Sequence, residues 1–295
     1  FLPDECAGRW RTTEKSEFPA GRMCRTLADN RKISRKKRVD DTAVPWLSFY
    51  PSSLLSTVFH PIVHSLKGIP MKAISKKEAI SIIICAAKDY EKLLNNKNFV
   101  FIYKNRTLNR IEYFEALFNA RNFQHLAGIR FTDTSGHIIT NRIQFYHKCI
   151  HNRLSESEIH FKSDGTTALK LYALPQIIHF LNSSRMTALY NSCRPRLSID
   201  RLIGTTNYSL GFTYDSRGYY VPSSSLLEDI RNLSSDPFQI LAILSKPASG
   251  TAPLYKEIKY MAKNICPDRL FLPHTLKSIL DIPSISTLSE HLVSQ

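Results

Sequence analysis

The change of pattern after residue 95 constrains the fold of this chain more than any other feature of its sequence. Ser75 and Glu78 form a capping-box sequence at the start of a helix. Apolar side chains then recur at helical spacing through residues 76–95, which predicts an amphipathic helix. Apolar segments at 99–103 and 110–118, separated by a polar turn, predict a β-hairpin. A helix followed at once by a hairpin favours an α+β protein over an all-helical one.

After the hairpin, the chain alternates between short helical and short extended patterns. Extended segments are predicted at residues 129–131, 159–162, 186–191, 199–205, 207–214, 219–221 and 238–246. Helices are predicted at residues 141–152, 226–232 and 254–264, and in the tail at 272–280 and 284–292. Another helix is predicted to start at residues 163–166 and to bend or restart at Pro175. We therefore expect the second half of the chain to contribute mostly strands.

The first 70 residues show neither helical nor strand periodicity, and they carry a concentrated basic run at residues 31–38. Such a run could act as a nucleic-acid-binding arm, but its composition favours solvated disorder. The sequence from Met71 onward resembles the start of a natural polypeptide. We therefore expect a basic extension at 1–70 that is disordered or not native to the functional protein, a folded domain at 71–266 and a helical tail at 267–295.

The charge of the chain favours a polyanionic partner. The net charge is +15 and the pI is about 9.6, and neutralisation of phosphates gives affinity that does not depend on sequence. A basic surface that only keeps the protein soluble is the alternative. No apolar run reaches the roughly 18 residues of a membrane helix, and no signal-peptide pattern is present. Six scattered cysteines without CxxC spacing fit a reducing cytoplasm better than secretion.

Several classes of chemistry lack their motifs. The sequence contains no P-loop, no GxGxxG, no GxSxG and no HExxH, which disfavours nucleotide hydrolysis, dinucleotide chemistry, α/β-hydrolase chemistry and zinc proteolysis. His147 and His151 are four residues apart and could chelate a metal on one helix face, although two exposed polar residues are the commoner case. We expect no cofactor and no metal.

His125 and Lys170 are the leading candidates for catalysis. His125 lies between Phe123 and Leu126, just before a glycine that can end a short helical turn, and histidine suits acid–base work near neutral pH. The alternative is a histidine satisfied within the core. Lys170 follows Thr166 by four residues at a predicted helix start, where a phosphate is favoured. The alternative is an ordinary exposed lysine.

A hydroxyl-rich segment at residues 205–209 is the second candidate region. Strand alternation would point Thr206 and Tyr208 to one face and Ser209 to the other, so either face could meet a substrate. Strands without any site also use such residues. The candidate catalytic residues are His125, Lys170, Thr206 and Ser209, and the candidate substrate-binding residues are Arg130, Thr166, Thr167, Tyr208 and Tyr220.

Between Met71 and Ile265, several segments together resemble a phage- and prophage-associated nuclease family of the barnase–EndoU–colicin–RelE-like superfamily. The order and spacing of the segments carry the resemblance. They are residues 123–128 (FQHLAG), the Phe145–Tyr146 helix, residues 164–171 (DGTTALKL), 210–212 (LGF), 220–231 (YVPSSSLLEDIR) and 243–246 (ILSK), followed by Tyr255. The family pattern has a threonine where Ala127 stands, which puts any contribution of that hydroxyl in doubt.

The resemblance implies a fold and an activity. It implies helices packed on a curved antiparallel sheet whose open face holds RNA, and a metal-independent ribonuclease that serves as a toxin or effector. It makes His125 and Lys170 the catalytic pair, with Thr206 or Ser209 assisting. We therefore expect an endoribonuclease that acts on tRNA, mRNA or rRNA and has an antitoxin or immunity protein as partner. A non-catalytic nucleic-acid-binding protein and a phage accessory protein are the rival hypotheses.

Overall fold

Eight strands form one sheet, and seven of them close into a barrel. The computed structural model describes residues 73–133, 135–191, 197–249, 254–263, 265 and 272–286, so the predicted extension and its basic run lie outside it. The strands are β1 (Lys97–Asn105), β2 (Arg110–Phe118), β5 (Met186–Leu189), β6 (Arg201–Gly204), β7 (Ser209–Tyr214), β8 (Tyr220–Leu226), β9 (Phe238–Pro247) and β10 (Glu257–Met261). Their order is β1-β2-β8-β7-β6-β5-β9-β10, and β1 also pairs with β9.

The β1–β9 pairing closes the ring and leaves β10 as an extra strand on β9. The α+β class is confirmed, but the predicted sheet with an open face is wrong, because the sheet curls until its first strand meets β9. Closure removes the exposed edges that an open sheet would leave. The pairing of β2 with β8 is parallel, whereas the other ladders described in this sheet are antiparallel.

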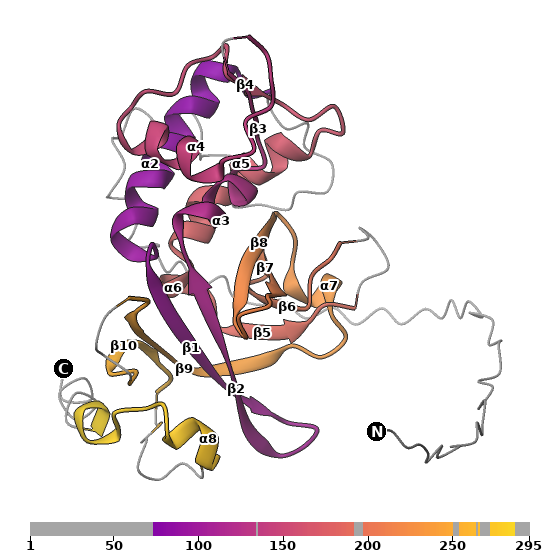
Figure 1. Cartoon of the computed structure of the whole chain (residues 1–295). Helices are drawn as coiled ribbons and strands as arrows, with labels where there is room; N and C mark the ends of the chain where they lie inside the picture. Colours follow the sequence, from indigo (N-terminus) through magenta and orange to yellow (C-terminus); the bar gives the residue numbers. More distant parts are fainter. Residues whose placement is uncertain are drawn as a thin grey trace, which may run out of the picture. The chain divides into compact units, whose positions relative to one another are not determined.

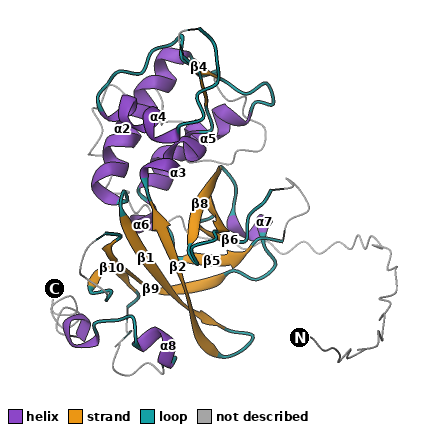
Figure 2. Ribbon diagram, viewed as in Figure 1, coloured by secondary structure: helices purple, strands orange, loops and turns teal. Residues whose placement is uncertain are grey.

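Most of the helices gather on one side of the barrel (Figure 1). The elements are α2 (Lys76–Leu93), α3 (Ala120–Ala127), α4 (Arg142–Ile150), α5 (Thr166–Ile178) and α6 (Phe180–Ser183), with a small sheet of β3 (Arg130–Phe131) and β4 (Ile159–His160). Figure 2 shows this helical layer beside the strands. The layer meets the barrel where α3 and α5 pack against β8. No helix among the described residues is long and apolar enough to cross a membrane.

The predicted helix and hairpin at the start of the domain are confirmed. Ser75 caps α2, and the reciprocal contact with Glu78 completes the capping box. β1 pairs with β2 in one continuous antiparallel register from Lys97↔Phe118 to Asn105↔Arg110. β1 is buried on both faces, because alternate residues face the barrel interior and the C-terminal segment. This explains the unbroken apolar run at 99–103.

Aromatic rings fill the interior of the barrel. Phe101 and Phe114 stack at 4.7 Å between ring centroids, and Phe118 stacks on Phe180 at 5.6 Å. Phe212 lies edge-on to Phe114 at 5.9 Å. Because Phe180 belongs to α6, that helix joins the core of the helical layer to the core of the barrel.

The helix predicted at residues 254–264 is a strand in the structure, and the helix predicted at residues 226–232 is confirmed only at its end. Residues 254–264 contain the strand β10, and a β-bulge between Ile258 and Tyr260 lets Ile258 and Met261 pack against the same apolar cluster. Their spacing of three therefore imitates a helix. Residues 226–232 begin with Leu226, the last residue of β8. β8 runs through Pro222, and the next residue, Ser223, is the extra residue of a β-bulge opposite Gly211 and Phe212 of β7.

Short helices lie at the other three places where helices were predicted in this half of the chain. Helix α7 covers only Ile230–Leu233. In the tail, α8 (His274–Lys277) is shorter than predicted, and residues 282–286 are helical up to the end of the described range. Helix α5 runs through Pro175 to Ile178 as one element rather than restarting there.

Candidate active site at the end of helix α3

Helix α3 presents His125 on its last turn. Asn119 caps the helix start and exchanges hydrogen bonds with Asn122, while Phe123 and Leu126 anchor the opposite face in the core. The helix ends at Gly128, which has a φ of 66° and therefore adopts the left-handed conformation of a C-cap. The side chain of His125 is exposed, so the helix holds it at the surface with little freedom in its backbone.

The carbonyl groups at this helix end are hydrogen-bonded to the helix's own C-cap and to two other elements of the fold. The N–H of Gly128 donates to the Gln124 oxygen at 3.1 Å. Lys170 Nζ on α5 donates to the His125 oxygen at 3.1 Å, and Ser225 Oγ on β8 donates to the Leu126 oxygen at 3.0 Å. Helix ends otherwise leave such carbonyls without partners inside the helix. The position of His125 is thus set by both the helical layer and the barrel.

Thr167 completes this connection from inside the protein. Its side chain is buried, its Oγ1 donates to the Gly128 oxygen at 2.9 Å, and the same Oγ1 accepts from the Lys162 N–H at 3.0 Å. One hydroxyl therefore joins the end of α3 to the loop before α5. Since Lys170 lies one turn further along α5, Thr167 also fixes the lysine relative to His125.

Glycine is required at position 128 for two reasons. A Cβ built there would lie 2.3 Å from Lys170 Cδ, well inside van der Waals contact. The positive φ also disfavours any residue with a side chain. The aliphatic part of Lys170 therefore crosses the helix end directly over Gly128.

The electrostatic environment keeps His125 neutral. Desolvation by its surroundings, followed by the positive charges of Arg142, Lys170 and Lys162, lowers the pKa of His125 from 6.5 to about 4. Partial burial and the charge of Lys162 lower the pKa of Lys170 to about 8, and Asp164 opposes this change. At pH 7 the site combines an uncharged imidazole with a lysine that still carries most of its charge.

Cationic side chains lie close to this pair, since Arg142 and Lys162 both lower the pKa of His125. Arg142 at the start of α4, Lys162 before α5 and Arg130 on β3 are all exposed. Asp164, the acid that acts on Lys170, accepts hydrogen bonds from the N–H and Oγ1 of Thr166 at 2.9 and 2.6 Å. The surface around His125 therefore suits a polyanion better than a cation.

A family model matches residues 82–261, and its description is phage-Barnase-EndoU-ColicinE5/D-RelE like nuclease4. The matched range covers more than half of the chain. The chain belongs to this nuclease family. The predicted resemblance is thus confirmed, and α3, α5 and β8 all lie inside the matched range. Among the curated proteins and the solved structures compared with it, none matches this nuclease.

The second region predicted for the site, residues 205–209, makes its hydrogen bonds elsewhere in this nuclease. Tyr208 is buried, and its hydroxyl contacts the hydroxyls of Ser183 and Ser184 at 2.7 and 3.0 Å. Ser209 is buried and donates to the Glu228 oxygen at 2.9 Å. Thr206 is exposed on the turn.

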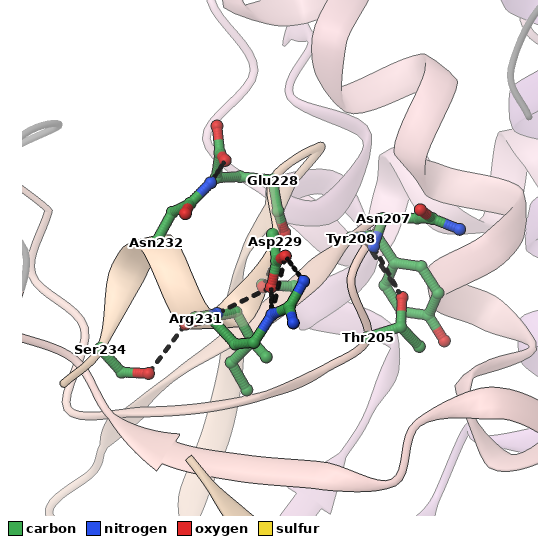
Figure 3. Close-up of polar contacts among 10 residues, drawn as sticks. Thr205, Asn207, Tyr208, Glu228, Asp229, Arg231, Asn232 and Ser234 are labelled. Atoms are coloured by element: carbon green, nitrogen blue, oxygen red, sulfur yellow. Dashed lines mark hydrogen bonds and ion pairs between the residues drawn. The ribbon is translucent and has the colours of Figure 1, made fainter. Parts of the chain in front are cut away.

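Thr205 organises that turn. Its Oγ1 accepts from the N–H groups of Asn207 and Tyr208 at 3.0 and 3.4 Å (Figure 3). Its carbonyl accepts from the N–H of Ile230 at 3.1 Å, which ties the turn to α7. The hydroxyls of Thr205, Tyr208 and Ser209 are therefore engaged in hydrogen bonds within the fold, whereas Thr206 is exposed.

The remaining predicted residues separate into two groups. Thr166, Thr167 and Arg130 lie on the elements that adjoin the end of α3, although Thr167 is buried behind it. Tyr220 lies at the opposite end of β8 from Ser225 and packs on Tyr214 at 5.1 Å between ring centroids. His147 and His151 stack at 6.3 Å, and across the described ranges no group of three His, Cys, Asp or Glu side chains is placed to hold a metal ion.

Sequence reasoning missed three contributors to the site. Ser225 lies in a segment predicted as a connection, so its place on a strand beside α3 was hidden. The sequence patterns did not single out Arg142 or Lys162, and their effect on the pKa of His125 is what distinguishes them. The positive φ of Gly128 was the one feature with a signal in the sequence, since a glycine after a helical turn favours a C-cap.

Proposed function

We propose that this nuclease is a metal-independent endoribonuclease whose reaction centres on His125 and Lys170. The proposal rests on the hydrogen bond from Lys170 Nζ to the carbonyl of His125, because it holds an ammonium group and an imidazole at one helix end. The neutral imidazole is ready to accept a proton at pH 7, and the lysine supplies positive charge.

The reaction would be transphosphorylation. His125 removes the proton from a ribose 2′-hydroxyl, and the oxygen forms a bond to the adjacent phosphorus. Lys170 stabilises the charge that develops on the phosphate oxygens. The bond from phosphorus to the 5′-oxygen breaks, and that oxygen leaves with a proton from the lysine, whose pKa of about 8 permits donation near neutral pH. The products are a 2′,3′-cyclic phosphate and a 5′-hydroxyl, and no water is consumed.

RNA binding would strengthen the base. A histidine with a pKa of about 4 is a weak base, and part of that low value comes from Arg142, Lys170 and Lys162. A bound phosphate neutralises these cations, so the pKa of His125 rises toward its ordinary value. Proton abstraction is then favoured only when a strand occupies the site. Arg130 and Thr166, on adjoining elements, would contact the same strand.

The biological role that fits this chemistry is a toxin or effector of a phage or prophage. The family description names phage nucleases, and the net charge of +15 suits a substrate such as tRNA, mRNA or rRNA in the cytoplasm. An acidic inhibitor protein would complement the same surface. The rival function is a nucleic-acid-binding protein without catalysis, for which the observation in favour is the cationic surrounding of His125 itself.

The test compares the full chain with His125→Ala and with His147→Ala, which removes an exposed histidine from α4. Each protein is incubated with total RNA in EDTA, and the cleaved ends are identified. Ends that carry 2′,3′-cyclic phosphate, present for the parent and His147→Ala but absent for His125→Ala, would support the proposal. Cleavage that survives in His125→Ala would contradict it. RNA binding without cleavage, abolished by Lys162→Glu but not by His125→Ala, would favour the rival function.

A further inference from the structure

A second charged site lies at the mouth of the barrel, away from the end of α3. Tyr103, Glu112 and Arg201 line an open cavity of about 430 Å³, together with Tyr113 on β2 and Thr275 from the C-terminal segment. This volume lies within the usual range for small-molecule sites, and barrel mouths are common places for them. Tyr220 on β8 contacts Arg201, whereas Ser225 contacts α3, so the two sites lie about 17 Å apart along that strand.

Arg201 is held on a platform of aromatic rings. Its guanidinium carbon lies 5.1 Å from the centroid of Phe114 and 5.5 Å from those of Tyr103 and Tyr220. Its Nη1 donates to the Tyr103 hydroxyl at 3.0 Å. Its buried Nε has no hydrogen-bond partner. The arginine is therefore fixed in place by neutral groups.

The nearby carboxylate does not neutralise this arginine. Glu112 accepts hydrogen bonds from the Tyr103 hydroxyl at 2.9 Å, from Asn105 at 3.2 Å and from Arg110 Nε at 2.8 Å. Burial alone would raise the pKa of Glu112, but these hydrogen bonds lower it, so the group is ionised and paired with Arg110. Within the described ranges, no carboxylate forms an ion pair with Arg201.

A partly buried, fixed cation without a counter-charge favours an anionic ligand. The two arginines and one glutamate leave the cavity with a net positive charge, and the ring of Tyr113 lines the same cavity. A phosphate beside an aromatic base matches this combination of a cation and a ring. We propose that the mouth of the barrel binds the phosphate of a nucleotide, either as a free mononucleotide or within a single strand.

The experiment measures binding of uridine 5′-monophosphate to the full chain by calorimetry. Arg201→Gln should weaken binding about tenfold or more, since it removes a charged partner of the phosphate. Lys88→Gln makes the same change of charge at an exposed position on α2 and should leave binding unaltered. Uridine, which lacks the phosphate, should bind at least tenfold more weakly than the monophosphate.

A second variant guards against misfolding of Arg201→Gln. Thr275 is exposed at the rim of the cavity, so Thr275→Glu should repel the phosphate without disturbing the Arg201 network. Ser157→Glu adds the same charge to an exposed loop in the helical layer and serves as its control. If Thr275→Glu and Arg201→Gln both bind the monophosphate as the parent does, or if the parent binds it no better than uridine, the proposal is overturned.

Two further arms identify the source of the phosphate and separate this site from the one at His125. A 2′-O-methyl oligoribonucleotide that binds much more tightly than the monophosphate, with the gain lost in Arg201→Gln, would assign the mouth to a strand. The titrations are repeated with Lys170→Met. Binding that depends on Arg201 but not on Lys170 belongs to the mouth of the barrel, whether or not RNA is cleaved. Monophosphate binding that requires Lys170 and not Arg201 would contradict the inference.

Discussion

The end of α3 and the turn at residues 205–209 contain similar polar residue types but use them in opposite ways. At the end of α3, buried groups such as Thr167 and Ser225 hold the backbone, and the reactive side chain of His125 stays exposed. At the turn, the hydroxyls of Tyr208 and Ser209 are themselves buried and bonded. A site therefore needs two kinds of polar group. Some bond the backbone and fix its position, and others stay exposed so that they can react with a substrate.

The contrast has an energetic basis. A buried hydroxyl with its hydrogen bonds made contributes to stability, but it cannot exchange partners with a substrate without leaving another group unsatisfied. His125 offers its ring while its backbone carbonyl is bonded by Lys170. Substitutions at the end of α3 and at the turn should therefore affect cleavage and stability differently.

The largest expected effect is on cleavage by His125→Ala. Loss of a general base typically costs about 10²–10⁴-fold in rate. Because the side chain is exposed, stability should change little, within about 0.5 kcal/mol. The measurement compares cleavage of a defined single-stranded RNA with urea unfolding of the same preparation. A variant that unfolds more easily in proportion to its lost activity would show that His125 acts through the fold instead.

Gly128→Ala should have the next largest effect. The left-handed conformation costs an alanine roughly 1–2 kcal/mol, and the new Cβ would also displace Lys170 from the His125 carbonyl. Cleavage should fall together with stability.

A double-mutant cycle separates these two contributions of Gly128→Ala. In a Lys170→Ala background the 2.3 Å clash with Cδ is absent and only the Cβ contact at 3.1 Å remains. Gly128→Ala should then cost mainly the conformational part, and the two substitutions should be non-additive by more than about 0.5 kcal/mol. If the two losses of unfolding free energy are additive in urea, the Lys170 side chain can move away from position 128 without a loss of stability.

A smaller effect is expected from Thr167→Val, which preserves shape but removes the buried hydroxyl. The Gly128 carbonyl and the Lys162 N–H would lose their partner, at a cost of about 1–3 kcal/mol. Cleavage should fall as well, because the end of α3, which carries His125, loses this attachment to α5.

Tyr208→Phe removes a buried hydroxyl from the turn at residues 205–209 and should cost about 0.5–1.5 kcal/mol. Equal losses of cleavage in the two variants would remove the distinction between the regions.

Sequence patterns predicted the helix and hairpin at the start of the domain, but they did not predict that the sheet closes into a barrel. The capping box of α2 and the β1–β2 hairpin depend on contacts close in sequence, and both are confirmed. Barrel closure depends on pairings such as Val100↔Leu244, whose partners are far apart in the chain. Neither strand contains a local signal for the other, because any apolar strand could have paired there. The helix predicted at 254–264 failed for a similar reason, since a bulge in β10 reproduces the spacing of a helix.

The site shows the same limit. The sequence could nominate His125 and Lys170 by residue type, but their contact depends on Gly128 and on the packing of α3 against α5. It could not tell exposed hydroxyls from buried ones at 205–209, because strand alternation does not say which face is covered. The effect of Arg142 and Lys162 on His125 arises only from proximity in three dimensions.

The last expected effect is a dependence of stability on acid pH that comes from His125, and solvent screening reduces it because the residue is exposed. Its pKa is about 4 in the folded protein and 6.5 when unperturbed, so between these values the unfolded chain binds more protons than the folded one. Stability contributed by this residue therefore rises with pH from about 4 to 6.5 and does not change above that range.

His125→Gln should lose that part of the pH dependence of stability, whereas His147→Gln should keep it. Urea midpoints measured from pH 4.5 to 7.5 provide the test. Identical slopes for the parent and His125→Gln would mean that neither desolvation nor the surrounding cations lower the pKa of the ring. Such a result would also weaken the link between RNA binding and base strength, because that link requires the same cations to lower the pKa in the free protein.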